Sequence, residues 1–168
     1  VDLEELTRRL ACRVSQKMGY NFQEVPDGQT LVDWAVQQGR IREVVSREIR
    51  TQLESFFKQR QIETSLALGY VQLVAGYLGV SRLPREDQNT LYAWIRGERL
   101  KAEELRSLLL SRSIDRYNAR DMLDSLSQLA RELDYKGLLI VIDGMENLIA
   151  RNSETGHWNY TKSALNDV

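Results

Sequence analysis

Apolar residues recur at every third or fourth position through most of residues 1–134, and this spacing constrains the fold more than any other feature of the sequence. It is the period of an amphipathic α-helix that buries one face. Glycines, prolines and polar residues that favour helix ends divide the pattern into separate segments. The apolar stripes run over residues 3–18, 31–35, 41–57, 91–95, 105–109 and 119–133. We therefore predict a bundle of amphipathic helices.

The segment 62–78 is apolar on nearly all sides, as expected for the helix at the centre of a bundle. Its interior contains Gly69 and Gly76, and each glycine costs a helix about 1 kcal/mol relative to alanine. Close packing of a neighbouring helix against the glycine offsets this cost. We therefore expect a buried central helix, and the glycines weaken this prediction unless a neighbouring helix packs close against them.

The stretch KGLLIVIDGMEN, residues 136–147, breaks the helical pattern. Aliphatic residues run without interruption from Leu138 to Ile142, between Gly137 and Asp143. Such a run is typical of a strand buried on both faces, and these strands are normally parallel strands inside a sheet. The predicted fold class is therefore mainly α: a multi-helix bundle with one buried parallel-type strand.

Asp143 follows directly after the predicted strand, and ligands of open α/β sheets bind at the carboxyl ends of strands. Aliphatic residues that end in an acid have the form of a Walker B strand, whose aspartate holds Mg²⁺ or its bound water beside the phosphates of ATP. A carboxylate suits this role because Mg²⁺ prefers oxygen ligands. Glu146 is the candidate catalytic acid, which would position water or a switch residue. The pair has a structural alternative, since an Asp N-cap and a Glu three positions later form a helix capping box.

A Walker B aspartate acts together with a phosphate-binding loop, and no Gly-x-x-x-x-Gly-Lys-Ser/Thr motif occurs in the 168 residues. The loop would have to lie upstream of Val1, so we expect the sequence to be part of a longer protein. We expect this piece to be inactive alone and to bind neither ATP nor Mg²⁺.

The composition excludes several classes of protein. A net charge of −1 provides no general attraction to nucleic acid or an anionic membrane. The one cysteine excludes an internal disulfide and a multi-cysteine zinc site. No apolar run approaches the roughly 18 residues that a bilayer span requires. We expect a cytoplasmic protein.

Residues 91–110 permit a second interpretation, in which two helices joined at Gly97 form a helix-turn-helix. Four basic residues would then face DNA phosphates: Arg96, Arg99, Lys101 and Arg106. Acidic residues stand among them, and a plain helical hairpin has the same pattern. The alternative to an ATPase is therefore a non-enzymatic helical module that binds protein or DNA, in which Asp143 and Glu146 only cap a helix.

Three segments in the same order resemble a known family. They are Tyr92–Glu98 (YAWIRGE), Ile114–Leu123 (IDRYNARDML) and Gly137–Leu148 (GLLIVIDGMENL), and the segment Arg151–Thr155 also fits. Together they resemble the ATP-binding P-loop proteins of bacterial phage-defence islands of the BREX type. That family carries a helical insertion between its Walker A and Walker B segments.

The resemblance implies that residues 1–134 are a helical insertion or regulatory module. It also implies that residues 135–168 supply the Walker B strand and the helix after it, as part of a P-loop α/β ATPase domain. It assigns the Walker B aspartate to Asp143 and the second acid to Glu146, with Gly144 in place of the family's first acid. The implied function is ATP binding and hydrolysis coupled to conformational change, with ATP and Mg²⁺ as cofactors of the full-length protein. The implied partners are other proteins of the defence system, with a homo-oligomer or DNA as further candidates and no membrane.

Overall fold

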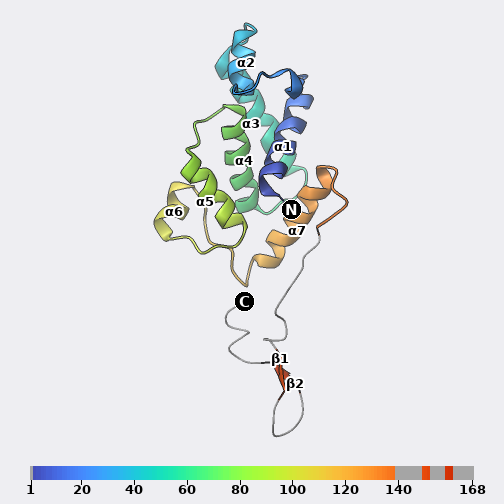
Figure 1. The fold of residues 1–168 in the computed structure, drawn as a ribbon, viewed down its shortest axis with the longest axis vertical. Coiled ribbons are helices and arrows are strands. Elements are labelled where there is room, and N and C mark those ends of the chain that lie inside the picture. Colours follow the sequence, from blue (N-terminus) through green and yellow to red (C-terminus); the bar gives the residue numbers. More distant parts are fainter. Residues whose placement is uncertain (1, 139–148, 152–157, 161–168) are drawn as a thin grey trace. The chain divides into compact units, whose positions relative to one another are not determined.

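A computed structural model describes residues 2–138 and two short segments, 149–151 and 158–160 (Figure 1). The chain divides into two compact units, Val1–Leu138 and Leu139–Val168, and each is described by itself. The first unit is helical. Its elements are α1 (Leu3–Lys17), the 3₁₀ turn η1 (Phe22–Glu24), α2 (Leu31–Gln37), α3 (Arg42–Lys58), α4 (Thr64–Leu78), α5 (Arg85–Ile95), α6 (Ala102–Ser107) and α7 (Ala119–Glu132).

Polar side chains fix several helix starts by binding the free backbone N–H groups of the first turn. The Asp2 carboxylate accepts hydrogen bonds from the backbone nitrogens of Glu4 (2.9 Å) and Glu5 (3.3 Å). The Glu63 carboxylate accepts one from the backbone nitrogen of Leu66 at 2.9 Å, at the start of α4. These contacts stabilise the observed first turns of α1 and α4.

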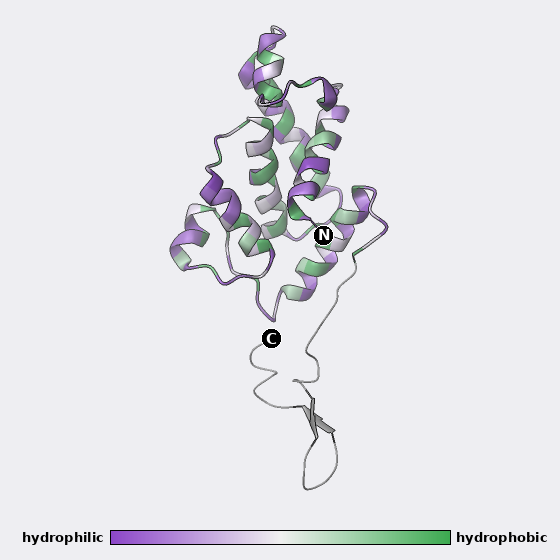
Figure 2. Cartoon of the chain, viewed as in Figure 1, coloured by the Kyte–Doolittle hydropathy of each residue, from purple (hydrophilic) through white to green (hydrophobic). Residues whose placement is uncertain are grey.

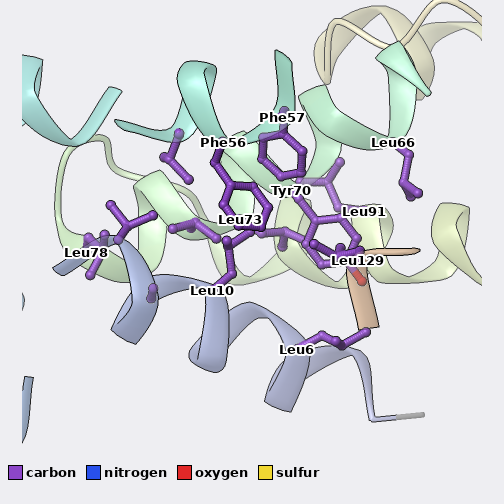
Figure 3. Packing of buried hydrophobic residues seen from close by; sticks show 14 of the residues in the cluster. Leu6, Leu10, Phe56, Phe57, Leu66, Tyr70, Leu73, Leu78, Leu91 and Leu129 are labelled. Atoms are coloured by element: carbon purple, nitrogen blue, oxygen red, sulfur yellow. The ribbon is translucent and has the colours of Figure 1, made fainter. Parts of the chain in front are cut away.

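Helix α4 lies at the centre of the first unit and packs against α1, α3, α5 and α7. Its buried side chains include Tyr70, Leu73 and Leu78, which meet residues of α1 and α3 in one apolar cluster (Figure 3). Figure 2 shows that the outer helices carry hydrophilic residues on the sides turned away from this cluster. The predicted buried central helix is confirmed.

Both interior glycines of α4 have a close neighbour, one on a helix and one in a loop. A Cβ atom on Gly69 would lie 3.4 Å from the Trp94 ring of α5. One on Gly76 would lie only 2.7 Å from the Leu83 Cβ, in the loop before α5. A side chain at Gly76 would therefore force this loop away from α4.

The second unit contains a two-stranded antiparallel ribbon. Strand β1 (Ile149–Arg151) pairs with β2 (Trp158–Tyr160), and the register places Ile149 opposite Tyr160 and Arg151 opposite Trp158. The predicted fold class is wrong in its strand, because the described residues contain no parallel strand and the sheet that they do contain is antiparallel. The physical reason is that an aliphatic run indicates burial but does not specify a partner, whereas an antiparallel pair needs only a nearby segment of the same chain. Leu139–Ile142 of the predicted strand lie outside the described residues.

None of the helices that the structure describes is both long enough and apolar enough to cross a membrane.

Candidate functional site

The two predicted site residues, Asp143 and Glu146, lie outside the described residues. The described feature that leads to them is the end of α7, from which the chain continues to Leu138. Within residues 2–138, 149–151 and 158–160, no group of three or more His, Cys, Asp or Glu residues is placed to hold a metal ion.

Helix α7 ends in a tight turn whose shape depends on Asp134. The backbone nitrogen of Tyr135 donates to the Ala130 carbonyl at 3.1 Å, and Asp134 has a φ of 66°. This is the left-handed conformation that commonly ends a helix and that normally selects glycine. The preceding residue, Leu133, is buried in the core. Helix α7 therefore ends at a buried leucine followed by an aspartate in the left-handed conformation.

Two arginines of α1 hold this turn. The Arg9 guanidinium donates to the Leu133 carbonyl at 3.3 Å and lies 4.3 Å from the centre of the Tyr135 ring. Arg13, one helical turn later, donates to the Asp134 carboxylate at 3.1 Å. We refer to Arg9, Arg13, Leu133, Asp134 and Tyr135 as the arginine clamp. It joins the first helix of the unit to the last one.

Other charged groups of α1 interact within the helix. The Glu5 carboxylate accepts hydrogen bonds from Arg8 at 2.7 Å and from Arg9 at 2.9 Å. The hydrogen bond from Arg8, followed by the one from Arg9, lowers the pKa of Glu5 to about 2. Arg9 is thus held from both sides, by Glu5 on its own helix and by the end of α7.

Cys12 lies on the same helix, and burial raises the pKa of its thiol. A thiol with a raised pKa stays protonated at neutral pH and is a poor nucleophile. This surface of α1 therefore provides charge and hydrogen bonds but no reactive sulfur.

The predicted helix-turn-helix has two helices and a turn, but its second helix is poorly suited to DNA. Gly97 follows α5 with a φ of 84°, and α6 is six residues long. The first turn of α6 carries Glu103 and Glu104, and the Glu104 carboxylate accepts a hydrogen bond from the Lys101 backbone nitrogen at 2.6 Å. Since a recognition helix contacts DNA with its N-terminal residues, these acids would face the phosphates. The geometry favours a plain helical hairpin.

The sequence reasoning missed the arginine clamp. Arg9 and Arg13 lie beside an apolar stripe and resemble ordinary surface residues of an amphipathic helix. Their partners are 124 and 121 positions away along the chain. A pattern of neighbouring residues in the sequence cannot predict a contact between residues so far apart along the chain.

Comparison with known proteins adds one result. A family model described as "BREX system ATP-binding protein BrxC/D" matches residues 23–166, which include most of the helical unit and the segment with Asp143 and Glu146. No curated protein and no solved structure matches the chain. Because the family match covers most of the sequence, the chain belongs to the family of BREX system ATP-binding proteins BrxC/D.

Proposed function

We propose that the full-length protein is a P-loop ATPase of the defence system in which Asp143 holds the Mg²⁺ of bound ATP. The observation that carries the proposal is the extent of the family match, which runs from residue 23 to residue 166 through both the helical unit and Asp143. Membership of an ATP-binding family supports a nucleotide as the ligand. The aliphatic run before Asp143 has the form of a Walker B strand, which makes this residue the best candidate to hold the Mg²⁺ of the nucleotide.

The chemistry required of Asp143 is coordination. Its carboxylate would bind Mg²⁺ directly or through a water molecule. The bound ion would neutralise negative charge on the phosphates of ATP. Glu146 would position the attacking water or a switch residue, as a second acid near the phosphates. Gly144 stands where the family has its first acid, and it has no side chain that could polarise water. We therefore assign the catalytic role in hydrolysis to Glu146.

The helical module, residues 1–134, would be the regulatory part, and residues 135–168 would belong to the P-loop core. Helices that share one apolar cluster move together as a rigid body. This property suits a module that couples ATP turnover to a conformational change. The proposed partners are other proteins of the defence system, and the proposed location is the cytoplasm.

The test is the affinity of the full-length protein for ATP with and without Mg²⁺. Asp143→Ala is expected to lower the Mg²⁺-dependent affinity about tenfold or more, because the ion loses a protein ligand or the partner of its bound water. Asp124→Ala is the matched control, since Asp124 is an exposed carboxylate 4.0 Å from Arg120 on α7. Equal Mg²⁺-dependent affinity in the wild type and Asp143→Ala would leave Asp143 and Glu146 as helix-capping residues.

A further inference from the structure

We propose that Leu109 is the apolar anchor of a docking surface for an acidic partner protein. Leu109 follows α6, and the exposed residues Arg106 and Arg112 stand on either side of it in the sequence. All three residues belong to the first unit, and the docking surface does not depend on the role proposed for Asp143.

Leu109 occupies a backbone position that normally selects glycine, and its φ is 55°. The backbone nitrogen of Leu109 donates to the Arg106 carbonyl at 3.1 Å, and that of Leu110 donates to the Leu105 carbonyl at 2.8 Å. These two bonds form a Schellman motif at the end of α6, in which the residue at the place of Leu109 is left-handed. In this conformation a Cβ atom crowds the backbone. A leucine here therefore costs stability that a glycine would not.

The chain has glycine at most of its other helix ends. A left-handed glycine comes after α1, α2, α4 and α5, at Gly19, Gly39, Gly79 and Gly97. The two further residues with a positive φ, Gln61 and Asp134, are polar. Leu109 is thus the one apolar side chain among the left-handed residues that the structure describes. Such a departure from the local rule indicates a role for the side chain other than stability.

The side chain of Leu109 lies in solvent and contributes little to the core. Its exposed fraction is 72%, the largest of any large aliphatic side chain in the described residues, whereas its neighbours Leu108 and Leu110 are buried. An exposed leucine between two buried ones offers apolar area that a partner can bury.

The backbone on both sides of Leu109 is held by side chains of α4 and α5. Gln72 donates to the Leu108 carbonyl at 2.7 Å, and the indole N–H of Trp94 donates to the Arg112 carbonyl at 3.0 Å. Leu109 is therefore fixed in place before a partner binds, which lowers the entropic cost of association.

The charge around Leu109 defines the partner. Residues 105–114 contain two arginines, Arg106 and Arg112, and no acidic residue. The nearest acids along the chain, Glu104 and Asp115, accept hydrogen bonds from backbone nitrogens of their own turns. An apolar side chain between two arginines fits a protein surface on which carboxylates surround an apolar pocket. The DNA backbone would attract the arginines but offers no pocket for an aliphatic side chain.

The experiment uses the full-length protein and begins with stability. Leu109→Gly is expected to raise the melting temperature by about 1 °C or more, because relief of the left-handed strain outweighs the freedom that glycine adds to the unfolded chain. Leu109→Asn should not lower it, because asparagine tolerates this conformation. A lower melting temperature in both variants would show that Leu109 supports the fold and would overturn the proposal.

Binding is measured with a displayed library of random peptides that is selected on the wild type. We expect the selected peptides to combine acidic residues with at least one large apolar residue. Leu109→Gly, Leu109→Asn and Arg106→Glu should each bind a selected peptide at least about fivefold more weakly than the wild type does. Arg106 is chosen for the charge reversal because Arg112 lies 3.8 Å from the Glu63 carboxylate.

Leu123→Ala and Arg50→Glu are the matched controls, since they alter an exposed leucine of α7 and an exposed arginine of α3. Both should bind the peptide as the wild type does. Selected peptides without acidic residues, or equal affinity of the wild type and Leu109→Gly, would overturn the proposal. It would also be overturned by binding of single-stranded oligothymidine in place of peptides, which would assign the surface to nucleic acid. Self-association that Leu109→Asn abolishes would likewise replace the acidic partner with a second copy of the chain.

Discussion

Tyr70 carries a hydroxyl group in the middle of the core that has no hydrogen-bond partner in the described part of the chain. Burial raises the pKa of this tyrosine, so the hydroxyl stays protonated. The hydroxyl of Tyr92 is also in the core region but donates to the Thr7 hydroxyl at 3.1 Å. The two residues form a natural comparison between an unsatisfied and a satisfied polar group.

Tyr70→Phe is expected to raise the free energy of unfolding by about 1 kcal/mol, because it removes a buried polar group that the fold does not satisfy. Tyr92→Phe should lower it by about the same amount, because a hydrogen bond is lost. Urea denaturation monitored by circular dichroism measures both changes as shifts of the midpoint at constant slope. A loss of stability in Tyr70→Phe would mean that the hydroxyl has a partner.

The same scale shows where sequence reasoning stops. Asp2 was predictable as an N-cap, because its partners are the next few residues. Arg9 and Arg13 were not, because their partners lie at the far end of the unit. A hydrogen bond between residues close in sequence can be predicted from the sequence, whereas a contact between α1 and the end of α7 forms only when the bundle folds.

At the scale of single elements, α1 is stabilised by the ion pairs of Glu5 with Arg8 and Arg9. Hydrogen bonds from these arginines hold the pKa of Glu5 at about 2 in the folded chain, below its usual value of 4.5. A carboxyl group whose pKa is lower in the folded chain than in the unfolded chain stabilises the fold at pH values above the pKa of the unfolded chain. This stabilisation is lost as the pH falls to the pKa of the folded chain.

Glu5→Gln should therefore lower the melting temperature at neutral pH, and the difference from the wild type should shrink between pH 4.5 and about pH 2. Glu4→Gln is the control, since Arg8 and Arg9 pair with Glu5 rather than with Glu4. Thermal unfolding followed at several pH values gives both curves. A difference that persists unchanged at about pH 2 would contradict the assignment.

The elements also divide into predictable and unpredictable ones for a physical reason. Helices α1, α3 and α4 have stripes or apolar content over four turns, and their positions follow from the sequence. Helix α6 ends at Ser107, although the predicted apolar stripe continues to Leu109. Leu109 adopts a left-handed φ of 55° and is exposed, so the prediction that it faces the core is wrong. The prediction of a parallel strand was wrong because strand pairing depends on a partner strand, which the aliphatic pattern does not identify.

At the scale of the whole molecule, the buried apolar cluster of the described residues runs from Leu6 to Leu133, all within the first unit. We expect a fragment of residues 1–138 to unfold cooperatively without the rest of the chain. A fragment of residues 1–118 lacks α7 and with it Met122, Leu129 and Leu133. Each such side chain contributes about 1.5–3 kcal/mol by burial, and their loss is comparable with the total stability of a domain.

The shorter fragment should therefore give a broad, non-cooperative thermal transition, whereas residues 1–138 should give a sharp one. Circular dichroism during heating distinguishes the two. Cooperative unfolding of residues 1–118 at the same temperature as residues 1–138 would show that α7 is not part of the folding unit.

We predict that this member of the BREX ATP-binding family uses the segment around Asp143 to bind nucleotide. Hydrogen exchange of the full-length protein, measured with and without saturating Mg²⁺-ATP, locates the ligand directly. Mg²⁺-ATP is expected to slow exchange in residues 138–148, while α3 exchanges at the same rate in both states. Unchanged exchange in residues 138–148 at a concentration at which ATP is bound would show that this segment does not bind the nucleotide.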